Sequence, residues 1–144
     1  MYESYTRQSL PTKRYRELLG SAICVFNSNN AFIVENILKY DDLDKYDWYH
    51  LIDLESGRLK GSVHEVITSK CGDEIETLFS QIIKMRNRII HSYRITNASG
   101  EQTLATKEKT EDGNTQFEIT EGYLLCFIQL NQELSDMLHD LRGY

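Results

Sequence analysis

The sequence of 144 residues has a single proline, Pro11, and no internal repeat or low-complexity tract. Because proline interrupts helices and central strands, its scarcity and the abundance of Leu, Ile, Glu and Lys favour long helices. No apolar run approaches the roughly 20 residues that cross a bilayer, which excludes a transmembrane helix. The N-terminus lacks the basic region and apolar stretch of a signal peptide, so we expect a cytoplasmic protein.

Cysteine is also scarce, with three residues at positions 24, 71 and 126. Their number and wide spacing exclude a disulfide framework and a CxxC metal site. Cys24 and Cys126 stand among apolar residues, which predicts that both pack in the core. No other His, Cys or acid lies at metal-ligand spacing from His91, so we expect no metal and no other cofactor.

Acidic residues outnumber basic ones, and the net charge of −6 argues against a protein that coats nucleic acid non-specifically. One stretch reverses this balance, because residues 80–100 contain no Asp or Glu but include Lys84, Arg86, Arg88 and Arg94. A positive strip within an acidic protein indicates a focused anion site.

Apolar residues recur at helical spacing over four long segments, which span about 12–40, 56–70, 73–93 and 121–142. A loose leader over 1–11 precedes them, and an acidic, aromatic connector over 41–53 joins the first two. Within 97–120, two alternating segments flank Asp112-Gly113-Asn114, which is typical of a β-hairpin; a disordered polar loop is the alternative. We therefore predict a single domain over 1–144, an all-α bundle of four to five helices with a small β-hairpin inserted before the last helix.

The third predicted helix carries charge where its apolar stripe should continue. Ile75, Phe79 and Ile82 mark the buried face, and the next step of four residues reaches Arg86. A charged group on an apolar face is costly unless it is paired or lies at a cleft. Asn87 and His91 are four residues apart and therefore share one edge of a helix. The spacing thus directs Arg86, Asn87 and His91 toward one patch near the helix end.

This trio suits cleavage of RNA without a metal, in which the ribose 2′-hydroxyl attacks the adjacent phosphorus. His91 can move protons near neutral pH, and the guanidinium of Arg86 matches phosphate oxygens. Asn87 can orient the histidine or donate a hydrogen bond to the phosphate. Lys84, Arg88 and Arg94 are candidates for binding the flanking RNA backbone. The alternative for an Arg or His near a helix end is a cap or a surface salt bridge.

The spacing of Arg86-Asn87, three residues and then His91 resembles the RxxxxH signature of HEPN domains (higher eukaryotes and prokaryotes nucleotide-binding). With Tyr93 two residues further on, it looks like the variant in HEPN toxins that are paired with nucleotidyltransferase antitoxins. The amphipathic stretch Ile82-Ile83-Lys84-Met85, which leads into the motif, is also typical of that family. The resemblance implies a HEPN-like helical bundle.

The same resemblance implies a metal-independent endoribonuclease of a toxin–antitoxin, abortive-infection or other antiphage system. It implies a homodimer whose two motifs face each other and form one composite cleft. If the residues that match the motif have the same roles as in that family, Arg86 and His91 are catalytic and Asn87 supports them. Tyr93 matches a position that can receive nucleotidyl groups that silence the enzyme, and a packing tyrosine is the alternative. The implied partners are an RNA substrate and an antitoxin protein such as a nucleotidyltransferase.

Two other functions stay open at this point. One is a non-catalytic HEPN-like module that binds a nucleotide or a protein. The other is a helical interaction protein that docks through the acidic, aromatic segment Asp41–Asp53.

Overall fold

The computed structural model describes residues 2–143, so Met1 and Tyr144 of the predicted domain lie outside the described residues. The described chain forms helices α1 (Lys13–Tyr40), α2 (Trp48–Asp53), α3 (Ser56–Val63), α4 (Ser69–Cys71), α5 (Glu74–Ile90) and α6 (Glu121–Arg142), strands β1 (Tyr93–Thr96), β2 (Gln102–Thr110) and β3 (Gly113–Ile119), a 3-10 turn (Tyr2–Tyr5) and a π-helical turn (His64–Thr68). None of the helices formed by residues 2–143 has both the length and the hydropathy that a membrane crossing requires.

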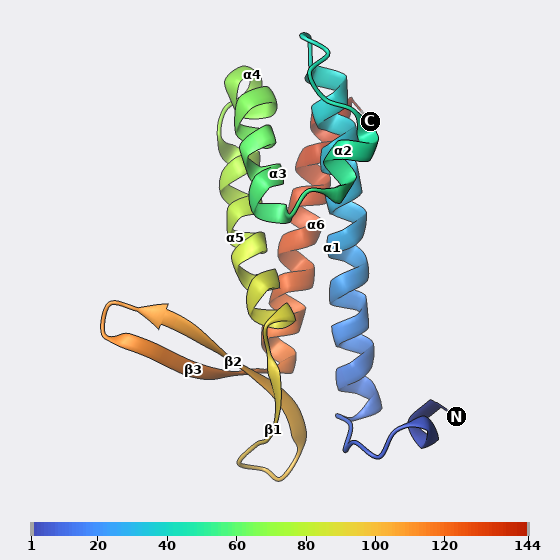
Figure 1. Cartoon of the computed structure of the whole chain (residues 1–144), viewed down its shortest axis with the longest axis vertical. Helices are drawn as coiled ribbons and strands as arrows, with labels where there is room; N and C mark the ends of the chain where they lie inside the picture. The colour runs from blue at the N-terminus through green and yellow to red at the C-terminus, as the bar shows by residue number, and fades with distance from the viewer. Residues whose placement is uncertain (1, 144) are drawn as a thin grey trace.

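The two longest helices, α1 and α6, lie side by side and run in the same direction (Figure 1). Their N-terminal ends are joined by Arg14 and Glu121, and their C-terminal ends by the Tyr40 hydroxyl, which donates to the Leu141 carbonyl at 2.7 Å. Between these points, the buried Asn29 amide donates to the Asn131 carbonyl at 2.7 Å. Since a buried amide must be hydrogen-bonded, this contact fixes the register of the two helices.

The second predicted helix corresponds to α3, the π-helical turn and α4, which follow one another without a break. Gly72, with φ of 88°, ends this segment in a conformation that costs glycine little. The chain then reverses into α5, which runs opposite to α1 and α6 (Figure 1). The core between these helices is built largely from fully buried side chains, among them Ile33, Leu59, Phe79, Phe127 and Leu134.

The expectation of an all-α HEPN-like bundle is wrong, because the chain also forms a three-stranded antiparallel sheet in the order β1-β2-β3. The hairpin of β2 and β3 lies where the sequence indicated one. The helix expected to reach Tyr93 ends at Ile90 instead, and Tyr93 opens β1, paired with Ala105. Helical spacing cannot reveal this strand, because its hydrogen-bonding partner lies at least six residues further along the chain.

Tyr15 of α1 attaches the sheet to the helices. Its buried hydroxyl donates to the Ile119 carbonyl at 2.5 Å and accepts from the Leu104 N–H at 3.2 Å. Leu104 and Ile119 are register partners on β2 and β3, so one hydroxyl bonds both strands where they enter the bundle. Burial raises the pKa of Tyr15 above its usual value, which keeps this hydroxyl protonated.

Cys24 and Cys126, expected in the core, are both exposed. Cys24 lies two residues before the buried Phe26 of α1, and two residues turn a helix by roughly 200°, to its opposite face. Apolar neighbours in sequence therefore did not indicate burial.

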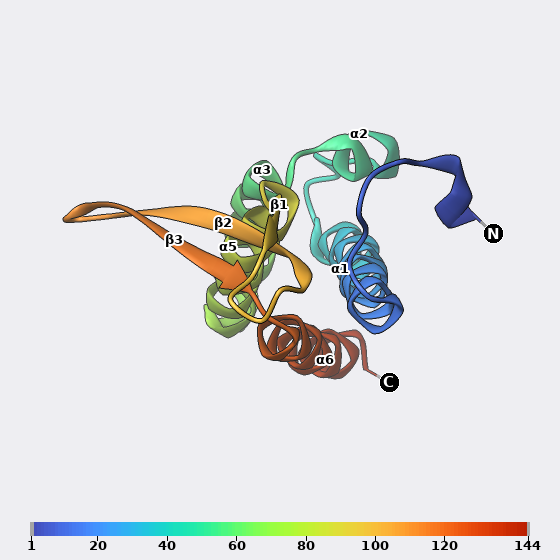
Figure 2. The same ribbon diagram turned by 90° about the horizontal axis from the view of Figure 1, so that it is seen from below.

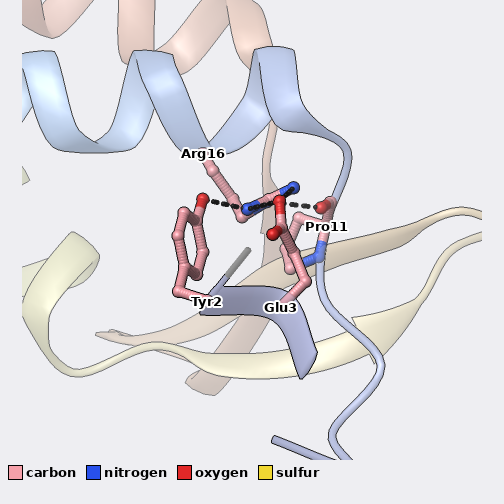
Figure 3. A network of polar contacts seen from close by, with 4 residues as sticks. All are labelled: Tyr2, Glu3, Pro11 and Arg16. Carbon is pink, nitrogen blue, oxygen red and sulfur yellow. Dashed lines mark hydrogen bonds and ion pairs between the residues drawn. The ribbon is translucent and has the colours of Figure 1, made fainter. Parts of the chain in front are cut away.

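The segment before α1 folds back on the first turn of that helix (Figure 3). Arg16 donates to the Pro11 carbonyl at 3.0 Å and also contacts the Tyr2 hydroxyl and the Glu3 carboxylate. These contacts hold the 3-10 turn, which lies within the predicted leader, against α1.

Candidate functional site

Arg86 continues the buried stripe of α5. Ile75, Phe79 and Ile82 are buried, and Arg86, one step further, is half-buried. Its guanidinium carbon lies 5.6 Å from the ring centroid of Phe26 on α1. An aromatic face attracts a cation at this distance, so Phe26 provides a surface on which the guanidinium rests.

The guanidinium of Arg86 has few polar partners. Its Nη1 donates to Oδ1 of Asn87 at 3.2 Å. No carboxylate among residues 2–143 forms an ion pair with it. Arginine carries five N–H donors, so most of its donors have no protein acceptor and can receive an anion.

His91 is the first residue beyond α5. Its backbone N–H donates to the Asn87 carbonyl at 3.0 Å, but its own φ of −95° and ψ of 33° depart from the helix. The side chain is exposed, and within residues 2–143 it forms no hydrogen bond or ion pair. One chain therefore joins Arg86 and Asn87 by a hydrogen bond, while the imidazole of His91 forms no hydrogen bond with either of them.

Tyr93 and Arg94 belong to the sheet rather than to a helix end. Tyr93 is 42% exposed and is the first residue of β1. Arg94 follows it on the opposite face of β1, and its Nη1 donates to Oε1 of Gln102 on the neighbouring strand. Arg94 thus lies on β1, whereas Lys84 and Arg88, with which it was grouped, lie on α5.

Lys84 and Arg88 face the β2–β3 hairpin. Nζ of Lys84 lies 3.2 Å from Oε1 of Glu108, and Nη1 of Arg88 donates to the Lys107 carbonyl. Together with Asn87, they line one side of a groove of 380 Å³.

The hairpin lines the other side of this groove with Lys107 and Lys109, which our reading of the sequence missed. Their spacing could have identified them, because residues two apart on a predicted strand share one face, so the two lysines were bound to lie side by side.

Tyr123 of α6 lies close to the same groove, where Glu108 and Arg88 act on it electrostatically. Burial, followed by the charge of Glu108, raises its pKa to about 12. The residue is therefore neutral at physiological pH and adds no charge to the groove.

Potential metal ligands do not gather in the described part of the chain: residues 2–143 contain no group of three or more His, Cys, Asp or Glu side chains that could hold an ion. A smaller polar cluster joins the π-helical turn to α5. Nδ1 of His64 lies 2.8 Å from Oε2 of Glu76, and the Thr68 hydroxyl donates to the same oxygen at 2.9 Å. These bonds hold the pKa of Glu76 below its usual value, with that from His64 the larger cause.

Comparison with known proteins adds nothing to this geometry, since no protein-family model, curated protein or solved structure matches the chain.

Proposed function

We propose that this chain is a metal-independent endoribonuclease that cleaves RNA by attack of the ribose 2′-hydroxyl, with Arg86 and His91 as its catalytic residues. The observation that carries the proposal is the half-buried guanidinium of Arg86, which rests on Phe26 and has no carboxylate partner within residues 2–143. A protein that used this arginine only for stability would gain from pairing it with an acid. An unpaired guanidinium at this position instead suits a transient phosphate.

In the proposed reaction, an imidazole takes the proton of the 2′-hydroxyl as its oxygen attacks phosphorus. The bond between 2′-oxygen and phosphorus forms, the bond to the 5′-oxygen breaks, and a protonated imidazole returns a proton to that leaving oxygen. Arg86 stabilises the negative charge that builds on the phosphoryl oxygens. The products are a 2′,3′-cyclic phosphate and a 5′-hydroxyl, and no step requires a metal ion.

The reaction requires a second copy of the chain. Within one chain the His91 side chain is hydrogen-bonded to neither Arg86 nor Asn87, and one imidazole cannot be base and acid on opposite sides of the phosphate at once. We therefore propose a homodimer in which two Arg86–His91 motifs share one cleft.

The sequence motif supports a cytoplasmic role as a HEPN-type toxin or antiphage effector. An antitoxin such as a nucleotidyltransferase would then silence the enzyme, and the exposed Tyr93 is the proposed site of modification.

The test is cleavage of end-labelled total RNA by the purified chain, with and without a chelator. We expect cleavage that resists the chelator, yields cyclic phosphate ends and is lost in His91→Ala. His50→Ala is the matched control, because His50 is an exposed histidine on α2. The absence of cleavage from every RNA tested, or cleavage that survives in His91→Ala, would refute the proposal. A strictly monomeric protein on sedimentation would refute the shared cleft.

A second candidate function is a non-catalytic module that binds a protein through the connector and α2. Leu43 and Tyr49 are 86% and 82% exposed there, and Asp42, Asp44 and Asp47 lie near them in the sequence. Failure of every RNA cleavage test, combined with retention of a basic protein partner, would favour this module.

A further inference from the structure

The groove between α5 and the β2–β3 hairpin concentrates positive charge in an acidic protein. Four cations line it, Lys84 and Arg88 from α5 and Lys107 and Lys109 from β2, against one acid, Glu108. The net charge of the whole chain is −6, so this groove opposes the overall balance. Such local reversals focus an electrostatic field and attract anions.

Most of this charge is not neutralised within the protein. Among residues 2–143, Glu108 forms an ion pair with Lys84 alone, and the guanidinium of Arg88 donates to a neutral carbonyl. Lys107 and Lys109 are exposed and form no ion pair among residues 2–143. Three positive charges are therefore left for a ligand.

The cations form two rows, which suits an elongated anion. Lys84 and Arg88 are four residues apart on a helix, where side chains repeat at about 6 Å. Lys107 and Lys109 are two residues apart on a strand, where the repeat is about 6.6 Å. A chain of phosphates lying between the rows can contact both.

The part of the hairpin beyond Lys107 contributes little to the stability of the core. Residues 109–116 are exposed, and the hairpin projects sideways from the helices (Figures 1 and 2). A projecting arm that buries little apolar surface but carries two lysines along the groove fits a binding role.

Asn87 links this groove to the proposed cleavage site. It lines the groove, and its Oδ1 accepts the hydrogen bond from Nη1 of Arg86. An RNA chain lying in the groove would thus contact Asn87, the residue that is hydrogen-bonded to Arg86.

We propose that this groove binds the phosphate backbone of RNA next to the scissile phosphate, with the hairpin as its outer wall. The identification of the polyanion as RNA rests on the proposed function, whereas the binding itself is tested separately. Recognition is through phosphates, so we expect little dependence on base sequence.

The experiment measures fluorescence anisotropy of a labelled single-stranded RNA bound to the full chain with His91→Ala, which the proposed mechanism predicts to be unable to cleave. In that background, Lys107→Glu with Lys109→Glu is compared with Lys13→Glu with Lys60→Glu, exposed lysines of α1 and α3 that change the net charge equally. We expect the groove variant to weaken binding at least about tenfold and the control variant less than about threefold. Each phosphate contact to single strands contributes about 0.7 to the slope of log affinity against log salt, so this slope should shrink by about 1.4.

Equal losses in the two variants would show that net charge alone governs binding and would overturn the proposal, as would unchanged binding in the groove variant. Lys107→Gln with Lys109→Gln, which introduces no acid, should lose affinity to a smaller degree, and circular dichroism checks the fold of each variant. Selective loss of binding in a chain that never cleaves RNA would leave the groove standing and refute the proposed function. Conversely, if the groove variant with His91 intact cleaves RNA as fast as the wild type, the cleavage proposal stands and the groove proposal is overturned.

Discussion

The guanidinium carbon of Arg86 lies 5.6 Å from the ring centroid of Phe26, so a cation of α5 rests on an aromatic side chain of α1. Phe26 in turn stacks on Phe127 of α6, with ring centroids 6.2 Å apart. The three main helices therefore meet beneath the proposed catalytic arginine. Because the Phe26 ring is buried, it gives the guanidinium a defined surface to rest on, which favours a preorganised phosphate site.

Replacing Arg86 by Met should separate stability from activity. A side chain in a buried ion pair typically costs about 3–5 kcal/mol when it is removed, but Arg86 has no carboxylate partner within residues 2–143. Loss of the cation–π contact costs about 0.5–1 kcal/mol, which relief of the half-buried charge offsets. We expect urea unfolding to change by less than about 1 kcal/mol while cleavage falls by about 100-fold or more. Arg58→Met, at an exposed site on α3, should alter neither, and a large loss of stability in Arg86→Met would indicate a structural arginine.

Tyr15→Phe should destabilise the fold by about 1–3 kcal/mol, because it removes a buried hydroxyl that bonds both Leu104 and Ile119. Hydrogen exchange of the β2 and β3 amides should increase more than that of α5. Tyr49→Phe is the matched control, since Tyr49 is 82% exposed and should change stability by less than about 0.5 kcal/mol. Equal stability of the two variants would mean that the sheet does not depend on Tyr15.

Glu76→Gln should lower stability at neutral pH but not in acid. The bonds from His64 and Thr68 lower the folded-state pKa of Glu76 below its reference value of 4.5. The stabilisation is therefore present above pH 4.5 and is lost as the pH falls through the folded-state pKa. Melting temperatures of the wild type and the variant, measured from pH 3 to pH 7, should converge at the acid end. A constant difference across this range would contradict the assignment.

Tyr123→Phe should remove part of the alkaline instability of the protein. The pKa of Tyr123 is raised from 10.0 to about 12, chiefly by burial. Its protonated form is thus favoured in the folded state, so its stabilisation is complete below pH 10 and is lost as the pH rises toward 12. Urea unfolding of wild type and variant at pH 9, 10, 11 and 12 measures the effect. Parallel pH curves would show that Tyr123 titrates normally.

The sequence predicted the helices where local signals agree. Thr12 and Thr120 each cap a helix by accepting a backbone hydrogen bond, and the apolar stripes that follow end near Tyr40 and Arg142, close to the predicted bounds. Capping and periodicity act within a few residues, so they can be read from the chain alone. The expected shared edge of Asn87 and His91 was less reliable, because α5 ends at Ile90.

By itself the sequence determined that Arg86 falls on the inner stripe of α5 and that charge around it is positive, since both follow from spacing and composition. Only the tertiary structure decided that no acid from residues 2–143 pairs with Arg86, that Phe26 supports it, and that Lys107 and Lys109 lie across a groove from α5. These relationships join residues some 20 to 60 positions apart. They depend on how helices pack and strands pair, which local patterns do not specify.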